Sequence, residues 1–461
     1  MEEGKGSRVR VHSKLRVMSS TPIEPNKVHK LSALDHAMAL HTVHVIFYYR
    51  ANPFHEGPME LDMDNLRITL SEHLCLYPPV TGRLVRDGEG NWEVKCNDAG
   101  IRMVRASVGV TVDEWLRSAD ASEERDLTVW ENMPQDPIIW SPLRIQLNDF
   151  EGGGLAIGLS FTHTHADPTS ATLFFKSWAD FHRGGLPILQ PPIFNLPAFT
   201  NHPTVNPSLK TSEYYIKKCK ETETVQSTKM PTLTFRFSGS KVMKCLSQVH
   251  PICPEATPFD VLAALFWLRI MRFTSPTPLS VCLDLRNHKT KAIPFHYFGN
   301  ALHFSSLSLH TEALEGCDEL GHVAGLVHKH VTGIKEEGEF WTALDWFESR
   351  KGETGKYAPP FRMYGPELTC ISMEHLFSGD CDDESLTYGA MFREEEKPVH
   401  VSYNVGNVGA GKGLIMVMPS PGDRLGRTVM VSLPEKQQIS ILSQDQAIME
   451  LDPQMLLSGR R

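Results

Sequence analysis

Short apolar runs alternate along this chain with segments in which apolar residues recur at helical spacing. The run Leu155–Phe161, which reads "LAIGLSF", directly follows three glycines and predicts a buried strand. In the next segment, residues 171–181, apolar side chains return every three or four positions, which predicts an amphipathic helix. Thr169 or Ser170 is expected to cap this helix.

The second half of the chain shows the same mixture of patterns. Thr257, Pro258 and Asp260 form a helix-start signature: a hydroxyl cap, a proline at the first helical position and an acid at the third. The runs at 278–286 and 413–420 predict strands. Helices and strands that alternate throughout predict an α/β fold.

One proline-rich segment interrupts this pattern. Leu186–Pro207 contains six prolines, which exclude both a helix and a central strand, yet it also carries large apolar residues. An extended crossover on the protein surface is therefore expected. We predict an N-terminal domain over residues 1–185, a crossover loop over 186–216 and a C-terminal domain over 217–461.

The predicted strand ends in "HTHAD", and His163 and Asp167 form the one H-x-x-x-D spacing in the chain. A neutral imidazole at a strand end can act as a general base near pH 7. Asp167 could orient this histidine or turn away and pair with an arginine. The alternative is a strand-end histidine that bonds only to the backbone, and these residues alone leave both readings open.

His165 alternates with His163 and is expected to face the other way in a structural role. No metal site is expected, because further clustered ligands are absent. The nine cysteines form no C-x-x-C pair, which favours reduced thiols in a cytoplasmic protein.

Composition and charge argue against several classes of function. The chain has 461 residues and a formal net charge of −9, which argues against sequence-independent nucleic-acid binding. We find no apolar run of a length that spans a bilayer and no apolar stretch typical of a secretory signal. Membrane contact is therefore expected only through a partner or at the surface.

Several segments, in order along the chain, resemble the BAHD acyl-CoA-dependent acyltransferases of plants. These are "LSALDHAMALHTVHVIFYY" (31–49), "LYPPVTGRL" (76–84), "HTHAD" (163–167) and "CLDLRNHKTKAIPFHYFGNAL" (282–302). The resemblance implies two chloramphenicol-acetyltransferase-like domains joined by an extended crossover, with a solvent channel between them. It also implies acyl-CoA as co-substrate, with no resident cofactor.

The resemblance assigns roles to three residues. His163 would be the general base that deprotonates the acceptor. Asp167 would pair with Arg286 and shape the loop, which predicts an Asp167–Arg286 contact. Pro168 stands where the family usually has glycine, and a proline could not adopt a positive φ.

The family's C-terminal Asp-Phe-Gly-Trp-Gly motif is expected to be degenerate here. We match it to residues 404–408, where Asn404 replaces the aspartate and Gly406 is retained. No catalytic side chain is expected from this segment.

Within the family, "VKCNDAGIRMVRASVGVTVDEWL" (94–116) and "VSYNVGNVGAGKGLIMVMP" (401–419) resemble the eceriferum/glossy group of cuticular wax proteins. That group is implicated in very-long-chain fatty acid elongation with a 3-ketoacyl-CoA synthase at the endoplasmic reticulum. Three functions stay open: an accessory protein of this kind, an O- or N-acyltransferase that uses His163, and an acyl-binding module without turnover. A monomer is expected.

Overall fold

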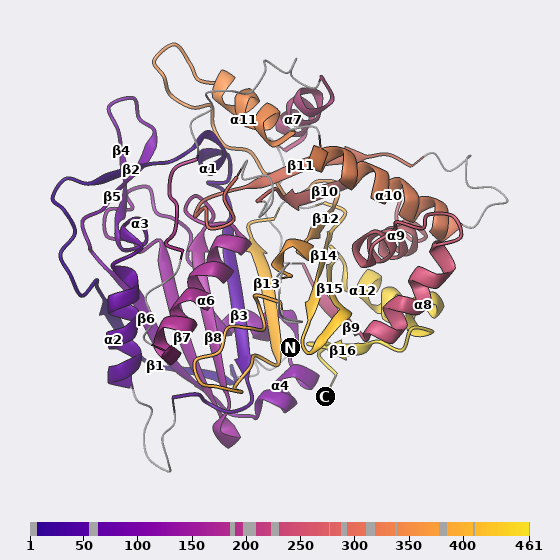
Figure 1. Cartoon of the computed structure of the whole chain (residues 1–461), viewed down its shortest axis with the longest axis horizontal. Coiled ribbons are helices and arrows are strands. Elements are labelled where there is room, and N and C mark those ends of the chain that lie inside the picture. Colours follow the sequence, from indigo (N-terminus) through magenta and orange to yellow (C-terminus); the bar gives the residue numbers. More distant parts are fainter. Residues whose placement is uncertain are drawn as a thin grey trace, which may run out of the picture.

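Two large mixed sheets lie side by side at the centre of the molecule, and most helices cover their outer faces (Figure 1). The structure is a computed structural model, and it describes residues 7–54, 63–184, 190–196, 209–222, 230–275, 277–286, 293–309, 319–336, 339–377, 385–408 and 411–460. This arrangement confirms the α/β prediction.

The first sheet has six strands in the order β1-β6-β7-β8-β3-β13, and a small sheet of order β2-β5-β4 lies beside it. Their bounds are β1 Val9–Val17, β6 Ile101–Val108, β7 Leu143–Phe150, β8 Leu155–Thr162, β3 Thr42–Tyr49, β13 His400–Gly406, β2 Val28–Lys30, β5 Trp92–Lys95 and β4 Arg83–Arg86. Every residue of β8 is buried, as the unbroken apolar run predicted.

The second sheet has seven strands in the order β11-β10-β12-β14-β15-β9-β16. Their bounds are β11 Leu302–Leu307, β10 Leu279–Asp284, β12 Leu368–Ser372, β14 Leu414–Ser420, β15 Asp423–Ser432, β9 Thr232–Phe237 and β16 Gln454–Leu456. The strands β10 and β14 confirm the two strands predicted from the apolar runs of the second half.

The α-helices of the described residues are between 4 and 18 residues long. They are α1 Ala33–Ala37, α2 Met63–Leu74, α3 Pro78–Thr81, α4 Val112–Ser118, α5 Ala121–Glu124, α6 Pro168–Gly184, α7 Leu209–Thr222, α8 Gly239–Val249, α9 Pro258–Met271, α10 Glu319–Glu336, α11 Glu339–Ser349, α12 Lys436–Leu442 and α13 Gln446–Met449. In α9 the predicted start is confirmed: the Thr257 and Asp260 side chains form a capping box around Pro258.

Strand β13 comes from the second half of the chain but belongs to the first sheet. It pairs antiparallel with β3, and His400 lies opposite Tyr48 while Gly406 lies opposite Thr42. One hydrophobic core also contains residues of both halves, such as Phe47 and Met416. The two halves of the chain are thus joined by a strand of the second half in the first sheet and by a shared core.

Helix α6 confirms the predicted amphipathic helix, but its cap differs from the prediction. Asp167 supplies the cap, because its Oδ1 accepts from the Ser170 N–H at 2.8 Å, so Thr169 and Ser170 lie inside the first turn. Pro168 is the first helical residue, where its fixed φ suits the helix and its missing N–H costs nothing. Proline at this position is therefore compatible with the loop.

Most of the predicted crossover lies outside the described residues. Of the segment 186–207, residues 190–196 are described, and Ile193 forms a parallel bridge with Tyr297. The crossover loop was predicted to reach residue 216, but the chain is helical from Leu209. Between Pro207 and Pro231 there is no proline to interrupt a helix. In addition, Tyr215 and Cys219 lie one helical turn apart and pack on the same core. The domain boundaries at 185 and 217 stay a prediction.

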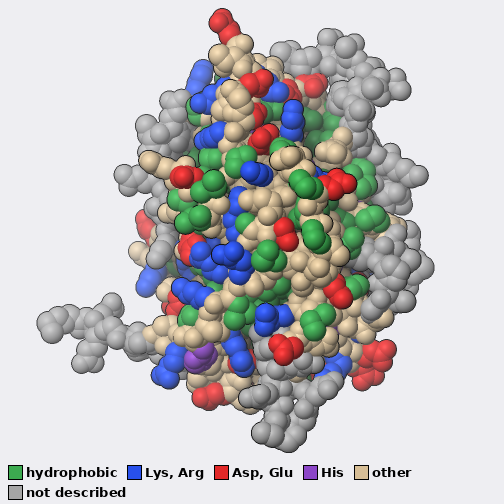
Figure 2. Space-filling view, turned by 90° about the vertical axis from the view of Figure 1, so that its left-hand side faces the viewer, with side chains coloured by type: hydrophobic (Ala, Val, Ile, Leu, Met, Phe, Trp, Pro, Cys, Tyr) green, Lys and Arg blue, Asp and Glu red, His purple; other side chains and the backbone are tan. Residues whose placement is uncertain are grey.

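The face formed by the first sheet and the small sheet carries mixed charges, with Lys and Arg side chains gathered near its middle (Figure 2). The edge strand β1 exposes three basic residues, Arg10, Lys14 and Arg16. No helix of the described residues is both long enough and apolar enough to cross a bilayer.

Candidate active site

His163 lies where β8 gives way to a tight turn. Its backbone N–H donates to the carbonyl of His41 at 3.0 Å, and the N–H of His165 closes the turn onto the Thr162 carbonyl at 2.9 Å. The Asn300 side chain donates to the His163 carbonyl at 2.8 Å. Bonds from three parts of the chain therefore fix the backbone that carries the imidazole.

The His163 ring lies between the two halves and is fully buried, with 0% of the residue exposed. Its Nε2 is 3.0 Å from the hydroxyl of Tyr364, which the second half contributes, while Nδ1 makes no hydrogen bond to another described residue. Burial lowers the pKa of His163, and the negative charge of Asp167 opposes this shift only in part. The imidazole is therefore neutral near pH 7, and we assign its acceptor lone pair to Nε2, facing the Tyr364 hydroxyl.

A second buried histidine adjoins this pair. The His41 ring centroid is 6.3 Å from that of His163 and 5.0 Å from that of Tyr364. Its Nε2 accepts from the N–H of Met363 at 3.0 Å, and its Nδ1 is 3.2 Å from the carbonyl of Gly406. Burial and the neighbouring His163 lower the pKa of His41 to about 3, so both rings are neutral at physiological pH.

Asp167 binds Arg286 in a bidentate ion pair. The Oδ2–Nη1 and Oδ1–Nη2 distances are 2.8 and 3.1 Å, and neither side chain is exposed. This confirms the predicted contact. Arg286 also donates to the carbonyls of Tyr297 and Gly299 and to the Ser170 hydroxyl, so its charge is fully hydrogen-bonded.

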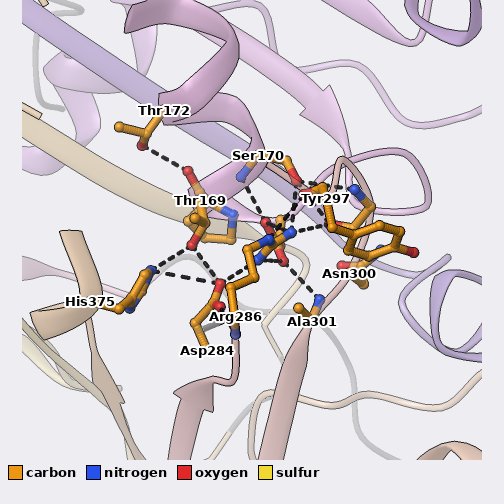
Figure 3. A network of polar contacts seen from close by, with 12 residues as sticks. Thr169, Ser170, Thr172, Asp284, Arg286, Tyr297, Asn300, Ala301 and His375 are labelled. Carbon is orange, nitrogen blue, oxygen red and sulfur yellow. Dashed lines mark hydrogen bonds and ion pairs between the residues drawn. The ribbon is translucent and has the colours of Figure 1, made fainter. Parts of the chain in front are cut away.

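Asp284 completes this buried network. It binds Arg286 and accepts from the Thr169 hydroxyl at 2.6 Å, and His375 lies 3.6 Å from its Oδ2 (Figure 3). Burial alone would raise the pKa of Asp284, but the charges of Arg286 and His375 outweigh it and hold that pKa below its usual value. The carboxylates of Asp167 and Asp284 thus flank one guanidinium.

Asp35 and Asn300 tie the first half to the second. Asp35 forms a capping box with Ser32 at the start of α1, and its Oδ1 accepts from both the backbone and the side chain of Asn300, at 3.1 and 2.7 Å. Asn300 in turn holds the His163 carbonyl. Asp35, Asn300, His41 and Tyr364 are site residues that no spacing in the sequence indicated, although Asn300 belongs to the Tyr-Phe-Gly-Asn segment.

The degenerate motif covers the last three residues of β13 and the two residues that follow it. The Asn404 amide is 3.5 Å from a carboxylate oxygen of Glu124, and Asn404 lines a cavity between the sheets. Gly406 packs against Thr42, and its carbonyl faces His41. That these residues take no part in catalysis stays a prediction.

The last candidates are His165 and a metal site among the described residues. His165 is buried, and its ring nitrogens have no hydrogen-bond partner among the described residues. No group of three or more His, Cys, Asp or Glu side chains within the described ranges could hold a metal ion. The structural role of His165 stays a prediction.

Comparison with known families agrees with this geometry. The sequence model of the transferase family matches residues 7–448, almost the whole chain. The chain belongs to this family, the BAHD transferases. The two-domain chloramphenicol-acetyltransferase-like fold that the resemblance implied is confirmed by solved structures.

Among its relatives, ECERIFERUM 2 of Arabidopsis thaliana is 26% identical over 95% of this chain and 97% of its own length. Hydroxycinnamoyltransferase 2 of rice (Oryza sativa subsp. japonica) is 28% identical over 91% of this chain and 96% of its own length. The crystal structure of vinorine synthase superposes with a TM-score of 0.66 at 20% identity and covers 96% of this chain and 98% of its own. A member of the eceriferum group and a hydroxycinnamoyltransferase are therefore both similar to this chain over nearly its full length.

Proposed function

We propose that this BAHD protein acts as an accessory in very-long-chain fatty acid elongation and cuticular wax formation, together with a 3-ketoacyl-CoA synthase. It binds acyl chains and works as a monomer in the cytoplasm, at the endoplasmic reticulum surface, where its partner holds it. The similarity to ECERIFERUM 2 over nearly the full length of both chains supports this proposal.

One observation carries this proposal: the imidazole nitrogen that would act as general base already has the hydroxyl of Tyr364 as its hydrogen-bond partner. His163 Nε2 faces the Tyr364 hydroxyl at 3.0 Å, and both residues are fully buried. A general base must lie within hydrogen-bond reach of the proton that it removes. In this arrangement an acceptor reaches His163 only after Tyr364 moves, whereas a surface that modifies a partner enzyme needs no such movement.

Acyl transfer is the second candidate function, because His163, Asp167 and Arg286 keep a transferase-like arrangement. In that reaction Nε2 of His163 takes the proton of an acceptor hydroxyl or amine, which attacks the carbonyl carbon of an acyl-CoA thioester. The new carbon–oxygen or carbon–nitrogen bond forms, the carbon–sulfur bond breaks, and the thiolate of CoA takes the proton back from the imidazolium. Asp167 and Arg286 hold the turn and take no proton.

Co-expression with a very-long-chain condensing enzyme tests the proposal. The chain-length profile of fatty acids should shift to longer products relative to the condensing enzyme alone, and the chain expressed without that enzyme should produce no shift. An unchanged profile in the presence of several such enzymes would contradict the accessory role. Acyl transfer by the purified chain to a hydroxyl or amine acceptor would support the second candidate instead.

A further inference from the structure

The turn that precedes β7 presents two isoleucines to solvent. The Trp140 N–H donates to the carbonyl of Pro137 at 2.9 Å, so Ile138 and Ile139 form the tip of this turn. Ile138 is 55% exposed and Ile139 is 85% exposed, the largest exposure of any large apolar side chain among the described residues. Hydration of both side chains is unfavourable, and an apolar phase at this tip would remove that cost.

The base of this isoleucine tip is held in place by packing and by a hydrogen bond. The Trp140 side chain is buried in a small apolar cluster with residues of β4 and β5. The guanidinium carbon of Arg144 lies 4.2 Å from the centroid of the Trp140 ring. The Asp136 carboxylate accepts from the N–H of Ile138 at 3.2 Å. The tip therefore stands on a fixed base next to Arg144.

A row of basic side chains begins at this base. Arg144 on β7 lies opposite Arg102 on β6, and Arg102 lies opposite Arg16 on β1. Residues directly opposite each other on neighbouring strands point to the same face of a sheet. Lys14 is two residues before Arg16 in the same strand and therefore faces the same way. Four cations from three strands thus form one basic row beside the isoleucine tip.

The basic row is only partly neutralised. Glu131 lies 2.6 Å from Arg102 and 3.4 Å from Arg144. Lys14 and Arg16 are exposed, and their charged groups make no hydrogen bond or salt bridge within the described ranges. The row, the turn and Glu131 together hold four cations and two carboxylates. This face therefore keeps a local positive charge, although the formal net charge of the chain is −9.

We propose that this face docks on a membrane that carries anionic phospholipids. The isoleucine tip inserts between the lipid head groups, and the basic row binds their phosphates. A lipid surface fits better than an acidic protein segment, because it offers an apolar phase and anionic groups together.

The docking face is separate from the site around His163. Strand β1 is the edge of the first sheet that lies furthest from β13, so a membrane on this side leaves the region between the two sheets uncovered (Figure 1). The contact is made directly with lipid and needs neither a condensing enzyme nor His163. It therefore stands apart from the proposed function.

Flotation of the purified full chain with lipid vesicles tests the docking. Vesicles of phosphatidylcholine alone are compared with vesicles that also contain phosphatidylserine. The chain should float with the anionic vesicles and not with the neutral ones, and added salt should weaken the binding. No binding to the anionic vesicles at low salt would overturn the proposal.

Ile139→Asp and Arg16→Gln test the tip and the row separately. Both residues are exposed, so each variant should fold as wild type does. Ile139→Asp removes an inserted side chain and adds a negative charge, so binding to anionic vesicles should weaken at least about tenfold. Arg16→Gln removes one cation near the lipid phosphates and should weaken it about fivefold.

Ile441→Asp and Arg272→Gln are the matched controls. Ile441 on α12 is 43% exposed, and the side chain of Arg272, the C-cap residue of α9, is 58% exposed. Both helices lie on the opposite side of the molecule from β1 (Figure 1). Neither control should change vesicle binding. Losses in the controls as large as those in Ile139→Asp and Arg16→Gln would overturn the proposal.

An acidic protein segment on the same face would give a different pattern. Arg16→Gln would then weaken binding of the chain to a polyglutamate resin, while Ile139→Asp would leave vesicle binding unchanged. That pattern would overturn lipid docking, because the tip would have no part in it. Weaker vesicle binding by both variants, with both controls unchanged, is the result that the proposal predicts.

Discussion

At the residue scale, Asp167 connects three parts of the molecule: it caps α6, binds Arg286 and accepts from the N–H of Ala301 at 2.9 Å. Removing one partner of a buried ion pair costs about 3–5 kcal/mol, because the other charge stays buried. Asp167→Asn should therefore lower the free energy of unfolding by about that amount, measured by denaturant titration.

Asp113→Asn provides the matched control for this substitution. Asp113 pairs with Arg50 at 3.0 Å, but their side chains are 50% and 66% exposed. Exposed pairs contribute about 0–1 kcal/mol, so this variant should unfold almost as wild type does. Equal stabilities of the two variants would contradict a structural role for Asp167.

Tyr364 is expected to set the protonation of His163. Its hydroxyl donates to the neutral imidazole, and such a bond favours the unprotonated form. Tyr364→Phe removes this donor, so the pKa of His163 should rise relative to wild type. Nitrogen-15 NMR of histidine-labelled protein measures the pKa of His163. The control is Tyr403→Phe, which changes another buried tyrosine. An unchanged His163 titration in Tyr364→Phe would show that the hydroxyl does not act on Nε2.

Sequence reasoning identified His163, Asp167 and Arg286 through a family resemblance, and the structure brings all three to one place. It missed Tyr364, which lies 201 residues from His163, because a contact formed by tertiary packing leaves no local pattern. The resemblance also implied a solvent channel between the two domains and a general base at His163, whereas the His163 ring is buried beside Tyr364 and His41.

At the element scale, the helices and strands with strong local signals were predictable. Helix α9 has a capping box and a first-turn proline, and β8 has an unbroken apolar run, so each was found within a few residues. The place of β13 was not predictable, because its pairing with β3 joins residues more than 350 positions apart in the chain. The cap of α6 was misassigned because three polar residues compete at its start.

The seam between β13 and β3 leaves no room for a side chain at Gly406. A Cβ there would collide with the Thr42 hydroxyl and approach a ring carbon of Trp130 to 3.1 Å. Gly406→Ala should therefore destabilise the fold by about 1–3 kcal/mol, the usual cost of overpacking. Thermal unfolding measures the effect.

The double variant Gly406→Ala with Thr42→Ala separates overpacking from a loss of backbone freedom. Removing the Thr42 hydroxyl makes room for the new methyl group, so the double variant should recover part of the lost stability. This packing account would be contradicted if the double variant lost more stability than the two single variants lose together.

At the scale of the whole molecule, buried histidines make stability depend on pH. Burial lowers the pKa of His41, His73, His165 and His303 to about 3. Below pH 6.5 these imidazoles take up protons in the unfolded chain but not in the folded one, so stability is full above pH 6.5 and falls progressively toward pH 3. At pH 5.5 each of these histidines should lower the free energy of unfolding by about 1.4 kcal/mol relative to its value well above pH 6.5.

Urea titrations at pH 7.5 and pH 5.5 measure this dependence. His303→Gln should reduce the difference between the two pH values, whereas His12→Gln, a change at an exposed residue of β1, should not. A free energy of unfolding that stays constant between pH 7.5 and pH 5.5 would contradict the neutral, buried state of these rings.

The central claim is that this BAHD protein acts on its partner without proton transfer at His163. Its most direct test is the fatty-acid chain-length profile of cells that co-express a very-long-chain condensing enzyme with wild type, His163→Ala or the control His12→Ala. The claim predicts that a folded His163→Ala shifts the profile to longer chains as wild type does. A general base contributes about 10²–10⁴-fold to a rate, so loss of the shift in His163→Ala alone, together with acyl transfer by purified wild type to an identified acceptor, would contradict it.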